Sequence, residues 1–347
     1  MLLKALILST LSSTSPYWQN GHVCFMRKRK CLKAIDLFAG VGGSSAGARA
    51  AGIRVVGAVD LWEVAESNYK ENFPEVTFFR SRCEQVDLDH LKQKIGHVDL
   101  ILASPECTSH TCAKGSARRS EKSRETAFQV LNFAAALNPR WIVVENVVHM
   151  RKWKRFDGWI RKIQSLGYQV TQQVINSADH GVAQSRRRLF LLCDRTRKPA
   201  KIKPTKKTSK FASKIVDSNG HYAFSPLRTE KRANATLERA ERAIKALGKK
   251  KPFLLVYYGS DAAGGWQKLQ RPLRTITTVD RFAYVRPCKD GHEMRMLQVP
   301  ELKAAMGFPA KHKLSYGTRR DQIKLLGNAV CPPVMEAAIR SLLRNSK

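Results

Sequence analysis

The sequence predicts an α/β fold, in which a doubly wound, mostly parallel sheet is accompanied by a smaller second domain. Short apolar runs alternate with longer segments of helical character, and this alternation is typical of parallel strands joined by helices. The stretch AGVGGSSAGARAAG follows the first run, and its small residues suit a helix that packs closely on a sheet. After Cys193 the composition becomes strongly basic, which marks a second unit. The length of 347 residues is sufficient for two domains.

Five short apolar runs are predicted as strands of the large sheet, because turn or polar residues bound them. A helix is predicted between the third and fourth runs over residues 125–136, and another, with Trp62 and Tyr69, follows the second run. The five predicted strands cover residues 32–38, 53–59, 98–103, 141–144 and 188–193.

The chain is predicted to divide into four segments. The N-terminal extension starts with an apolar stretch that is too short to cross a bilayer; we expect it to be disordered, with Met26 as a candidate for the true start in place of Met1. A large and a small domain follow, and the last segment returns to the large domain with a helix over residues 329–343. The segments cover residues 1–31, 32–194, 195–272 and 273–347.

The small domain opens with a basic arm, residues 195–214, which has no acidic residue. Residues 230–248 are predicted to form an amphipathic helix, because their apolar side chains recur on one face. Two strands of a separate, smaller sheet are predicted over residues 252–258 and 273–278.

Charge and cysteine content limit the classes of function. The formal net charge of +34 predicts a polyanionic partner, with nucleic acid as the first candidate. The eight cysteines are scattered without C-x-x-C or zinc-finger spacing, which favours free thiols in a reducing compartment over disulfides or structural zinc. No apolar run is long enough to span a membrane, so a cytoplasmic, nucleoid-associated protein is expected.

A cofactor site is predicted at two strand ends. The motif DLFAGVGG, residues 36–43, places glycines between a strand and a helix, where the backbone can approach a ligand closely. It matches G-x-G-x-x-G poorly, which argues against a dinucleotide. Asp60 ends the second strand, where a carboxylate can accept hydrogen bonds from ribose hydroxyls. Together these features favour a cofactor that contains a nucleoside.

A thiol and a carboxyl group are predicted to face the same crevice. Cys107 follows the third strand and Glu145 ends the fourth, and the carboxyl ends of parallel strands meet at the ligand edge of a sheet. By itself, such a cysteine is more often a buried structural thiol than a nucleophile. A metal site made of Cys107, His110 and Cys112 is disfavoured, because no second cluster of ligands completes it.

A series of five motifs resembles that of the DNA cytosine-5 methyltransferases, from about Lys33 to Met335. The resemblance implies a Rossmann-like methyltransferase fold, S-adenosylmethionine as cofactor and double-stranded DNA as partner, with the target cytosine flipped out of the duplex. It also implies that the large domain is catalytic and that residues 195–272 form a target recognition domain. The motifs are DLFAGVGG (36–43), SPECT (104–108), ENV (145–147), QSRRR (184–188) and GNAV (327–330).

The resemblance also implies catalytic roles. Cys107 would be the nucleophile that adds to C6 of the cytosine, and Glu145 would bind the N3/N4 edge of the base. Arg186 and Arg188 would position the base and the catalytic groups. A basic loop, residues 113–124, would close over DNA phosphates. The residues expected to contact DNA are Asn146, Gln184, Lys114, Arg118 and Arg119.

The cofactor-binding roles that the resemblance implies come from both ends of the chain. Asp60 would hold the ribose, Leu61 would lie against the adenine, and Asn328 would complete the site. The full set is Asp36, Phe38, Gly40, Gly42, Asp60, Leu61, Ser104, Asn328 and Val330.

The sequence departs from the family pattern at two places. The family commonly has Pro-Cys-Gln at the nucleophile, whereas this chain has Glu106, Cys107 and Thr108. Because a neighbouring carboxylate disfavours a thiolate, we expect Glu106 to point away from the thiol and to meet a basic side chain. The family often has an aspartate that contacts the adenine amine where this chain has Arg82 and Glu84, so that contact is not assigned.

The predicted activity is transfer of a methyl group to cytosine C5 through a covalent Cys107–C6 adduct, in a restriction-modification, orphan or phage modification enzyme. We expect a monomer without a stable complex with a cognate restriction endonuclease. A tRNA cytosine-5 methyltransferase is an alternative, since that branch shares the motifs. A catalytically inactive DNA-binding homologue is another, although the presence of all four catalytic residues speaks against it.

Overall fold

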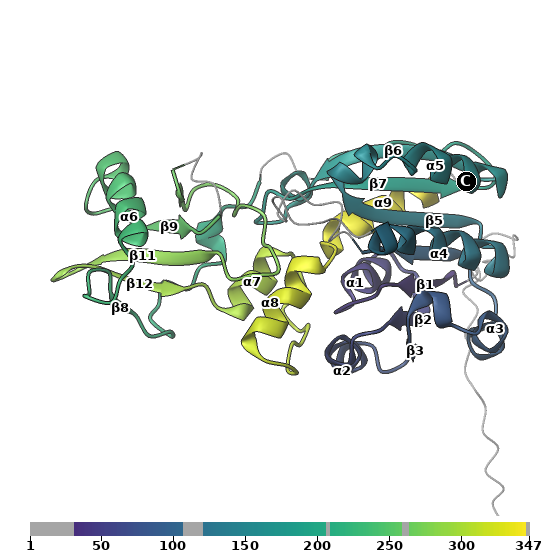
Figure 1. Cartoon of the computed structure of the whole chain (residues 1–347), viewed down its shortest axis with the longest axis horizontal. Helices are drawn as coiled ribbons and strands as arrows, with labels where there is room; N and C mark the ends of the chain where they lie inside the picture. Colours follow the sequence, from purple (N-terminus) through teal and green to yellow (C-terminus); the bar gives the residue numbers. More distant parts are fainter. Residues whose placement is uncertain (1–30, 107–120, 206–208, 259–263, 345–347) are drawn as a thin grey trace, which may run out of the picture. The chain divides into compact units, whose positions relative to one another are not determined.

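The computed structural model describes residues 31–106, 121–205, 209–258 and 264–344. Residues 32–347 form one compact unit, and two sheets lie within its described part (Figure 1). The predicted N-terminal extension lies outside the described residues up to residue 30. In the described ranges, no helix is both long and apolar enough to cross a membrane.

The larger sheet has seven strands in the order β3-β2-β1-β4-β5-β7-β6. Its first five strands in that order run parallel, whereas β7 is antiparallel to both β5 and β6. This arrangement confirms the predicted doubly wound, mostly parallel sheet. The sequence pattern misses β3, which is short, and β6, which is rich in glutamine. The strands are β1 (Lys33–Leu37), β2 (Arg54–Asp60), β3 (Thr77–Arg80), β4 (Leu100–Ala103), β5 (Trp141–Val147), β6 (Gln169–Asn176) and β7 (Arg187–Asp194).

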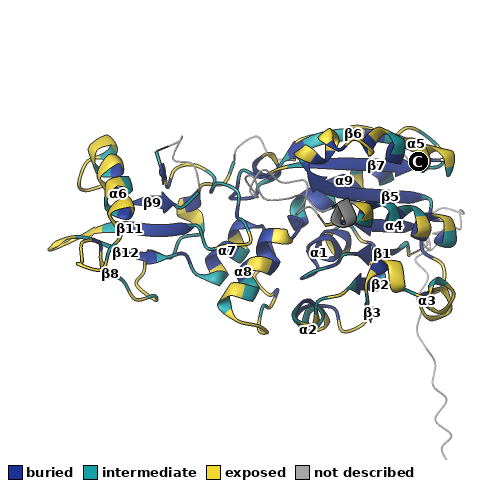
Figure 2. Ribbon diagram, in the orientation of Figure 1, coloured by how far each residue is buried: buried dark blue, intermediate teal, exposed yellow. Residues whose placement is uncertain are grey.

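Two hydrophobic cores lie on opposite faces of this sheet, and both appear as dark blue elements in Figure 2. Successive residues of β4 alternate between them, with Leu100 and Leu102 in one core and Ile101 and Ala103 in the other. Side chains of α1, α2 and α9 complete the first core, and those of α3, α4 and α5 complete the second. These helices are α1 (Gly43–Ala50), α2 (Glu63–Asn72), α3 (Leu88–Ile95), α4 (Glu121–Leu137), α5 (Phe156–Ser165) and α9 (Pro332–Arg344).

Helix α1 packs very closely on α9, as its small residues predict. A Cβ atom at Gly47 would lie 2.7 Å from the Cβ of Met335 and 2.7 Å from the carbonyl oxygen of Pro332. The C-terminal helix predicted over residues 329–343 is therefore confirmed as α9, and it belongs to the large domain. Short 3₁₀ turns connect other elements: η1 (Cys83–Gln85), η3 (Val148–Lys152), η4 (Ser177–His180) and η5 (Ala212–Lys214).

The smaller sheet has five antiparallel strands in the order β10-β9-β11-β12-β8. The predicted amphipathic helix is confirmed as α6 (Asn234–Leu247), which buries Ala240 and Ala243 against Phe253 and Leu255. The sheet continues past residue 272, because β11 and β12 belong to it. Its strands are β8 (Ser225–Pro226), β9 (Phe253–Val256), β10 (Trp266–Lys268), β11 (Phe282–Cys288) and β12 (Gly291–Met296).

The predicted strand over residues 273–278 is wrong. In this segment only Leu273 forms a β-bridge, and its partner is Gln184. Side chains from other parts of the chain form hydrogen bonds with backbone groups that would otherwise pair with a neighbouring strand. The amide of Gln184 accepts a hydrogen bond from the backbone N–H of Ile276 (2.8 Å), and Tyr258 donates its hydroxyl to the carbonyl of Thr275 (2.6 Å). The β-branched residues of this segment therefore lie outside the small sheet, without strand pairing.

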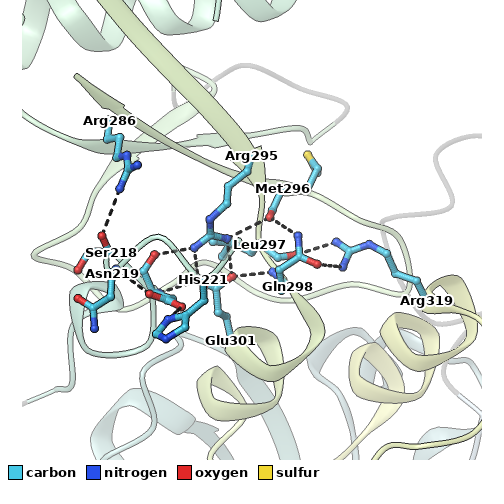
Figure 3. A network of polar contacts seen from close by, with 11 residues as sticks. Ser218, Asn219, His221, Arg286, Arg295, Met296, Leu297, Gln298, Glu301 and Arg319 are labelled. Carbon is cyan, nitrogen blue, oxygen red and sulfur yellow. Dashed lines mark hydrogen bonds and ion pairs between the residues drawn. The ribbon is translucent and has the colours of Figure 1, made fainter. Parts of the chain in front are cut away.

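A buried ion pair lies where β12 leads into α7 (Val299–Ala305) and α8 (Arg319–Asn328) (Figure 3). Arg295 donates two hydrogen bonds to the carboxylate of Glu301, at 2.8 and 2.7 Å, and a third to the carbonyl of Asp217 at 2.7 Å. Glu301 also accepts the backbone N–H groups of Asp217 and Gln298. Arg319 joins this network from α8 through the side chain of Gln298. The pair thus fixes the end of the small sheet to the helices that follow it.

We expect Glu301→Gln to lower the free energy of unfolding by about 3–5 kcal/mol, because it leaves the charge of Arg295 buried without its partner. Urea unfolding followed by circular dichroism measures the change. The matched control is Glu241→Gln, which breaks the exposed pair of Arg228 and Glu241 at 2.9 Å and should cost about 0–1 kcal/mol. Equal losses for the two variants would contradict a structural role for the buried pair.

Candidate active site

A cavity of about 540 Å³ lies at the carboxyl ends of the central strands of the large sheet. Its lining comes from the turn after β1, the ends of β2, β4 and β5, the start of β7 and the end of α8. Ten of the predicted site residues lie along this one surface: Phe38, Gly40, Asp60, Leu61, Ser104, Glu145, Arg186, Arg188, Asn328 and Val330.

The turn after β1 is fixed by a hydrogen bond to Asp60, which lies at the end of the neighbouring strand β2. Phe38 and Gly40 both have left-handed backbones, with φ of 60° and 51°, and such a conformation is uncommon for a bulky side chain. The carboxylate of Asp60 accepts the N–H of Gly40 at 2.8 Å and the N–H of Trp62 at 2.9 Å. Burial raises the pKa of Asp60, while these N–H groups act in the opposite direction. The carboxylate still lines the cavity, where further hydroxyl donors can reach it.

Asp36 and Gly42, two predicted cofactor-binding residues, lie beneath the turn rather than among the residues that line the cavity. One carboxylate oxygen of Asp36 accepts both the N–H (3.1 Å) and the hydroxyl (2.7 Å) of Ser45. Complete burial raises the pKa of Asp36 to about 7. A Cβ atom at Gly42 would lie 2.5 Å from the ring of Phe73. Both residues therefore support the turn through the start of α1.

The opposite end of the cavity contains a buried carboxyl group paired with an arginine. Glu145 on β5 is 6% exposed, and its carboxylate lies 3.1 Å from the guanidinium of Arg188 on β7. Burial raises the pKa of Glu145, and the charges of Arg188 and Arg186 lower it in part. The pairing of β5 with β7 brings these side chains together, since Val147 lies opposite Arg188 in the ladder.

Arg186 points into the protein, where it organises two other segments. Its guanidinium donates hydrogen bonds to the carbonyl of Ile276 at 2.9 Å and to those of Gly327 and Ala329 at 2.7 and 3.3 Å. The last two carbonyls flank Asn328, a predicted cofactor-binding residue. Arg186 therefore fixes one wall of the cavity.

Gln184 and Asn146, two predicted DNA contacts, are buried scaffold residues in this structure. Gln184 is completely buried, and its side chain donates to the carbonyl of Ala305 (3.4 Å) and accepts from Ile276. The amide of Asn146 donates to the carbonyl of Pro105 at 3.0 Å. Neither position supports a direct contact with DNA. Asn146 instead holds the chain two residues before Cys107.

Several predicted residues lie outside the described part of the chain. They are Cys107, His110 and Cys112, and the basic loop residues Lys114, Arg118 and Arg119. Their predicted roles stay predictions, as does the orientation of Glu106 relative to the thiol. Among the residues that the structure does describe, no group of three or more His, Cys, Asp or Glu side chains could hold a metal ion.

Trp62 and Lys324 are among the cavity-lining residues that the motifs do not mark. Trp62 follows the cavity-lining Leu61, and the ammonium group of Lys324 on α8 lies 4.5 Å from the centre of its ring. Trp62 could have been predicted at the cavity because it lies two residues after Asp60 in the sequence, whereas nothing in the sequence indicates that Lys324 lies there. Arg82 and Glu84, at which the family pattern breaks, also line the cavity and lie 3.8 Å apart.

The fold and the site are those of a Rossmann-like methyltransferase. The features that indicate this class are the doubly wound sheet, the glycine turn, the acidic end of β2 and the buried Glu145–Arg188 pair. The family model described as C-5 cytosine-specific DNA methylase matches residues 32–344, and the chain belongs to this family. It is a DNA cytosine-5 methyltransferase.

Two curated relatives match over most of their length. The type II methyltransferase M.HgiDI of Herpetosiphon aurantiacus is 27% identical over 311 residues, which cover 86% of this chain and 90% of the relative. The type II methyltransferase M.HindV of Haemophilus influenzae is 26% identical over 312 residues, which cover 86% and 92%.

Solved structures show the same fold. The DNMT2 of Spodoptera frugiperda superposes with a TM-score of 0.67 at 18% identity, covering 90% of this chain and 99% of that structure. The methyltransferase EhMeth of Entamoeba histolytica superposes with a TM-score of 0.67 at 17% identity, covering 92% and 100%.

Enzymes of this family use S-adenosylmethionine, and the cavity fits this cofactor. Its volume of about 540 Å³ is within the range of small-molecule sites. The carboxylate of Asp60 suits ribose hydroxyls, and Leu61, 51% exposed, offers an apolar surface to a purine. Asn328 and Val330 would close the site from the C-terminal part of the chain.

The protonation of Asp36 should make the stability of this turn depend on pH. Its pKa is about 7 in the folded protein and near 3.8 in the unfolded chain, so the folded protein binds this proton more tightly between those values. The contribution of Asp36 to stability should therefore fall as the pH rises from about 4 to about 7. We expect Asp36→Asn to be more stable than the unchanged protein at pH 8 and similar to it near pH 4.

Chemical unfolding at a series of pH values measures this difference. Ser45→Ala is the companion variant, because it removes a hydrogen bond that favours the ionised carboxylate and should therefore extend the loss of stability to higher pH. Parallel pH profiles for all three proteins would show that Asp36 does not titrate in this range.

Proposed function

We propose that this enzyme methylates C5 of a cytosine that is flipped out of a short duplex DNA sequence, through a covalent Cys107–C6 adduct. The buried Glu145–Arg188 pair carries this proposal, because it presents a carboxyl group with a raised pKa in the same cavity as the cofactor turn. The names of the two curated relatives support a place in a type II restriction-modification system. An orphan or phage modification role is compatible with the same site.

The proposed mechanism uses the thiol to activate the base. The thiolate of Cys107 adds to C6, and the electron pair of the C5–C6 bond becomes available at C5. The cofactor supplies an electrophilic methyl group on its sulfonium. Loss of the C5 proton to a base then restores the double bond and expels the thiolate. The cytosine must leave the stack, since no side chain reaches C6 within the duplex.

Glu145 is proposed to bind the edge of the cytosine and to place a proton at N3. Burial favours the protonated carboxyl group, and the guanidinium of Arg188 holds it in one orientation. A proton at N3 withdraws charge from the ring, which lowers the cost of thiolate addition at C6. Arg188 also brings a positive charge to this end of the cavity.

The small sheet is proposed to carry target recognition. We place the end of this domain at residue 296 rather than 272, because β11 and β12 pair within the small sheet. The basic arm, residues 195–214, would contact phosphates, and other side chains of the domain would read bases. We propose that the enzyme acts as a monomer on double-stranded DNA, without a stable complex with a restriction endonuclease.

Bisulfite sequencing of DNA from cells that express the protein tests the activity and finds the target sequence. We expect C5 methylation at one short motif, its absence with Cys107→Ser, and a rate lowered by about 10²–10⁴-fold with Glu145→Gln. Duplex DNA with 5-fluorocytosine at the target should retain the unchanged protein on a denaturing gel, because the adduct cannot lose fluorine as a cation. Methylated tRNA beside unmethylated DNA would overturn the proposal, as would methylation that persists in Cys107→Ser.

A further inference from the structure

Val279 is an apolar side chain that stays 53% exposed on the segment between Ile276 and β11. A single exposed apolar residue is common on protein surfaces, so its exposure alone indicates no function. Its position is informative, because the segment that carries it is fixed at both ends beside the cavity.

Residues of the cavity wall fix the start of this segment. The guanidinium of Arg186, which lines the cavity, donates to the carbonyl of Ile276 at 2.9 Å. A Cβ atom at Gly327 would lie 2.4 Å from the carbonyl oxygen of Thr277, so the backbone here lies directly against the end of α8. Val279 follows Ile276 by three residues, a length of chain that reaches at most about 11 Å. Val279 therefore lies close to the cavity wall.

The first turn of α8 fixes the other end of the segment. Arg319 donates to the carboxylate of Asp280 at 2.6 Å. Within the segment, the hydroxyl of Thr277 donates to the carbonyl of Val279 at 3.1 Å and accepts the N–H of Val279 at 3.4 Å. The backbone on both sides of Val279 is thus held by side chains, and its apolar side chain is exposed at a defined place.

The surface beside this segment is suited to a DNA backbone. Helix α8 lies along the segment, since its first turn contacts Asp280 and its last turn contacts Thr277. The same helix exposes Arg320 and Lys324, and Lys324 also lines the cavity. The cavity therefore reaches solvent beside α8, next to basic side chains that attract phosphates.

We propose that Val279 enters the duplex beside the target cytosine and fills part of the space that the flipped base leaves. This inference rests on the proposed function, which brings a cytosine out of the stack and to Glu145 in the same cavity. A duplex that delivers this base has to lie against the rim of the cavity, where Val279 is exposed.

The chemistry of the side chain suits this role. An apolar side chain that inserts at a base step replaces part of the stacking that is lost there. Valine is β-branched and has few rotamers, so it loses little conformational freedom when it inserts. In this role Val279 stabilises the flipped state of the duplex and does not read its sequence.

Binding to two duplexes with S-adenosylhomocysteine present, followed by fluorescence anisotropy, tests the proposal. One duplex contains the methylated motif that bisulfite sequencing finds, and the other has the same composition without the motif. For Val279→Ala we expect the Kd of the target duplex to rise about three- to tenfold, because less apolar surface fills the gap. The Kd of the other duplex should change less than about twofold, since no base leaves the stack there. Val279→Ile keeps a sufficient apolar side chain and should restore the affinity for the target.

Bisulfite sequencing of DNA from cells that express Val279→Ala separates this role from base reading. A side chain that fills the gap acts on every target alike, so the methylated motif should stay the same. A side chain that contacts a base edge restricts the motif, so its loss would add new methylated sequences.

The control is Tyr316→Ala, because Tyr316 is 49% exposed before α8 and lies outside the lining of the cavity. It should leave the ratio of the two Kd values unchanged, and thermal unfolding checks that each variant is folded. The proposal is overturned by equal weakening of both duplexes in Val279→Ala, by no weakening, or by a broader motif. Failure of Val279→Ile to restore affinity, or the same selective change in the control, also overturns it.

A duplex with 2-aminopurine at the target position tests base flipping by the unchanged protein, because the fluorescence of this base rises when it leaves the stack. If the fluorescence does not rise, or if no motif is methylated in cells, the proposed function is wrong and the role of Val279 falls with it. If the fluorescence rises and the ratio of Kd values does not shift in Val279→Ala, the role of Val279 is wrong and base flipping stands.

Discussion

The guanidinium of Arg186 joins parts of the chain that are far apart in sequence. It donates to the carbonyl of Ile276, 90 residues further along, and to that of Gly327, 141 residues further along. A buried cation needs such acceptors, because leaving it without them costs several kcal/mol, on the order of 3–5. The start of β7, the segment over residues 273–278 and the end of α8 are therefore held in one arrangement. The cavity wall that contains Asn328 depends on this contact.

Most of the large sheet could be predicted from the sequence, because its buried strands are continuous apolar runs. The segment over residues 273–278 is rich in β-branched residues, yet it forms no strand, because Gln184 and Arg186 occupy its backbone groups. The composition of a segment does not show which distant side chains will form hydrogen bonds with its backbone. The site shows the same limit: the motifs mark the residue types at Gln184 and Asn146, but only the fold shows that both are buried.

The two ends of the cavity treat a buried carboxyl group differently. Asp60 receives backbone N–H groups, which stabilise its negative charge and leave lone pairs for hydroxyl donors. Glu145 pairs with the guanidinium of Arg188, and burial raises its pKa as it raises the pKa of Asp60. The two ends therefore differ in the partners of the carboxyl group, which are backbone N–H groups at Asp60 and a side-chain cation at Glu145. Between them, Ser104 and Pro105 follow β4 and link the cofactor turn at Phe38 to Asn146 on β5.

The close contact of α1 with α9 affects how the newly made chain acquires its activity. The ribosome releases the N-terminal part first. The turn after β1 and the strand ends are then in place before the residues around Val330 and Met335, which complete the cavity and cover α1. Gly43 stays uncovered until Val330 reaches it, and Gly47 stays uncovered until α9 packs against it. A chain synthesised only as far as β7 can thus form much of the large sheet and still lack Val330 at the cavity, so the cofactor site is completed only after residues 328–335 have been added.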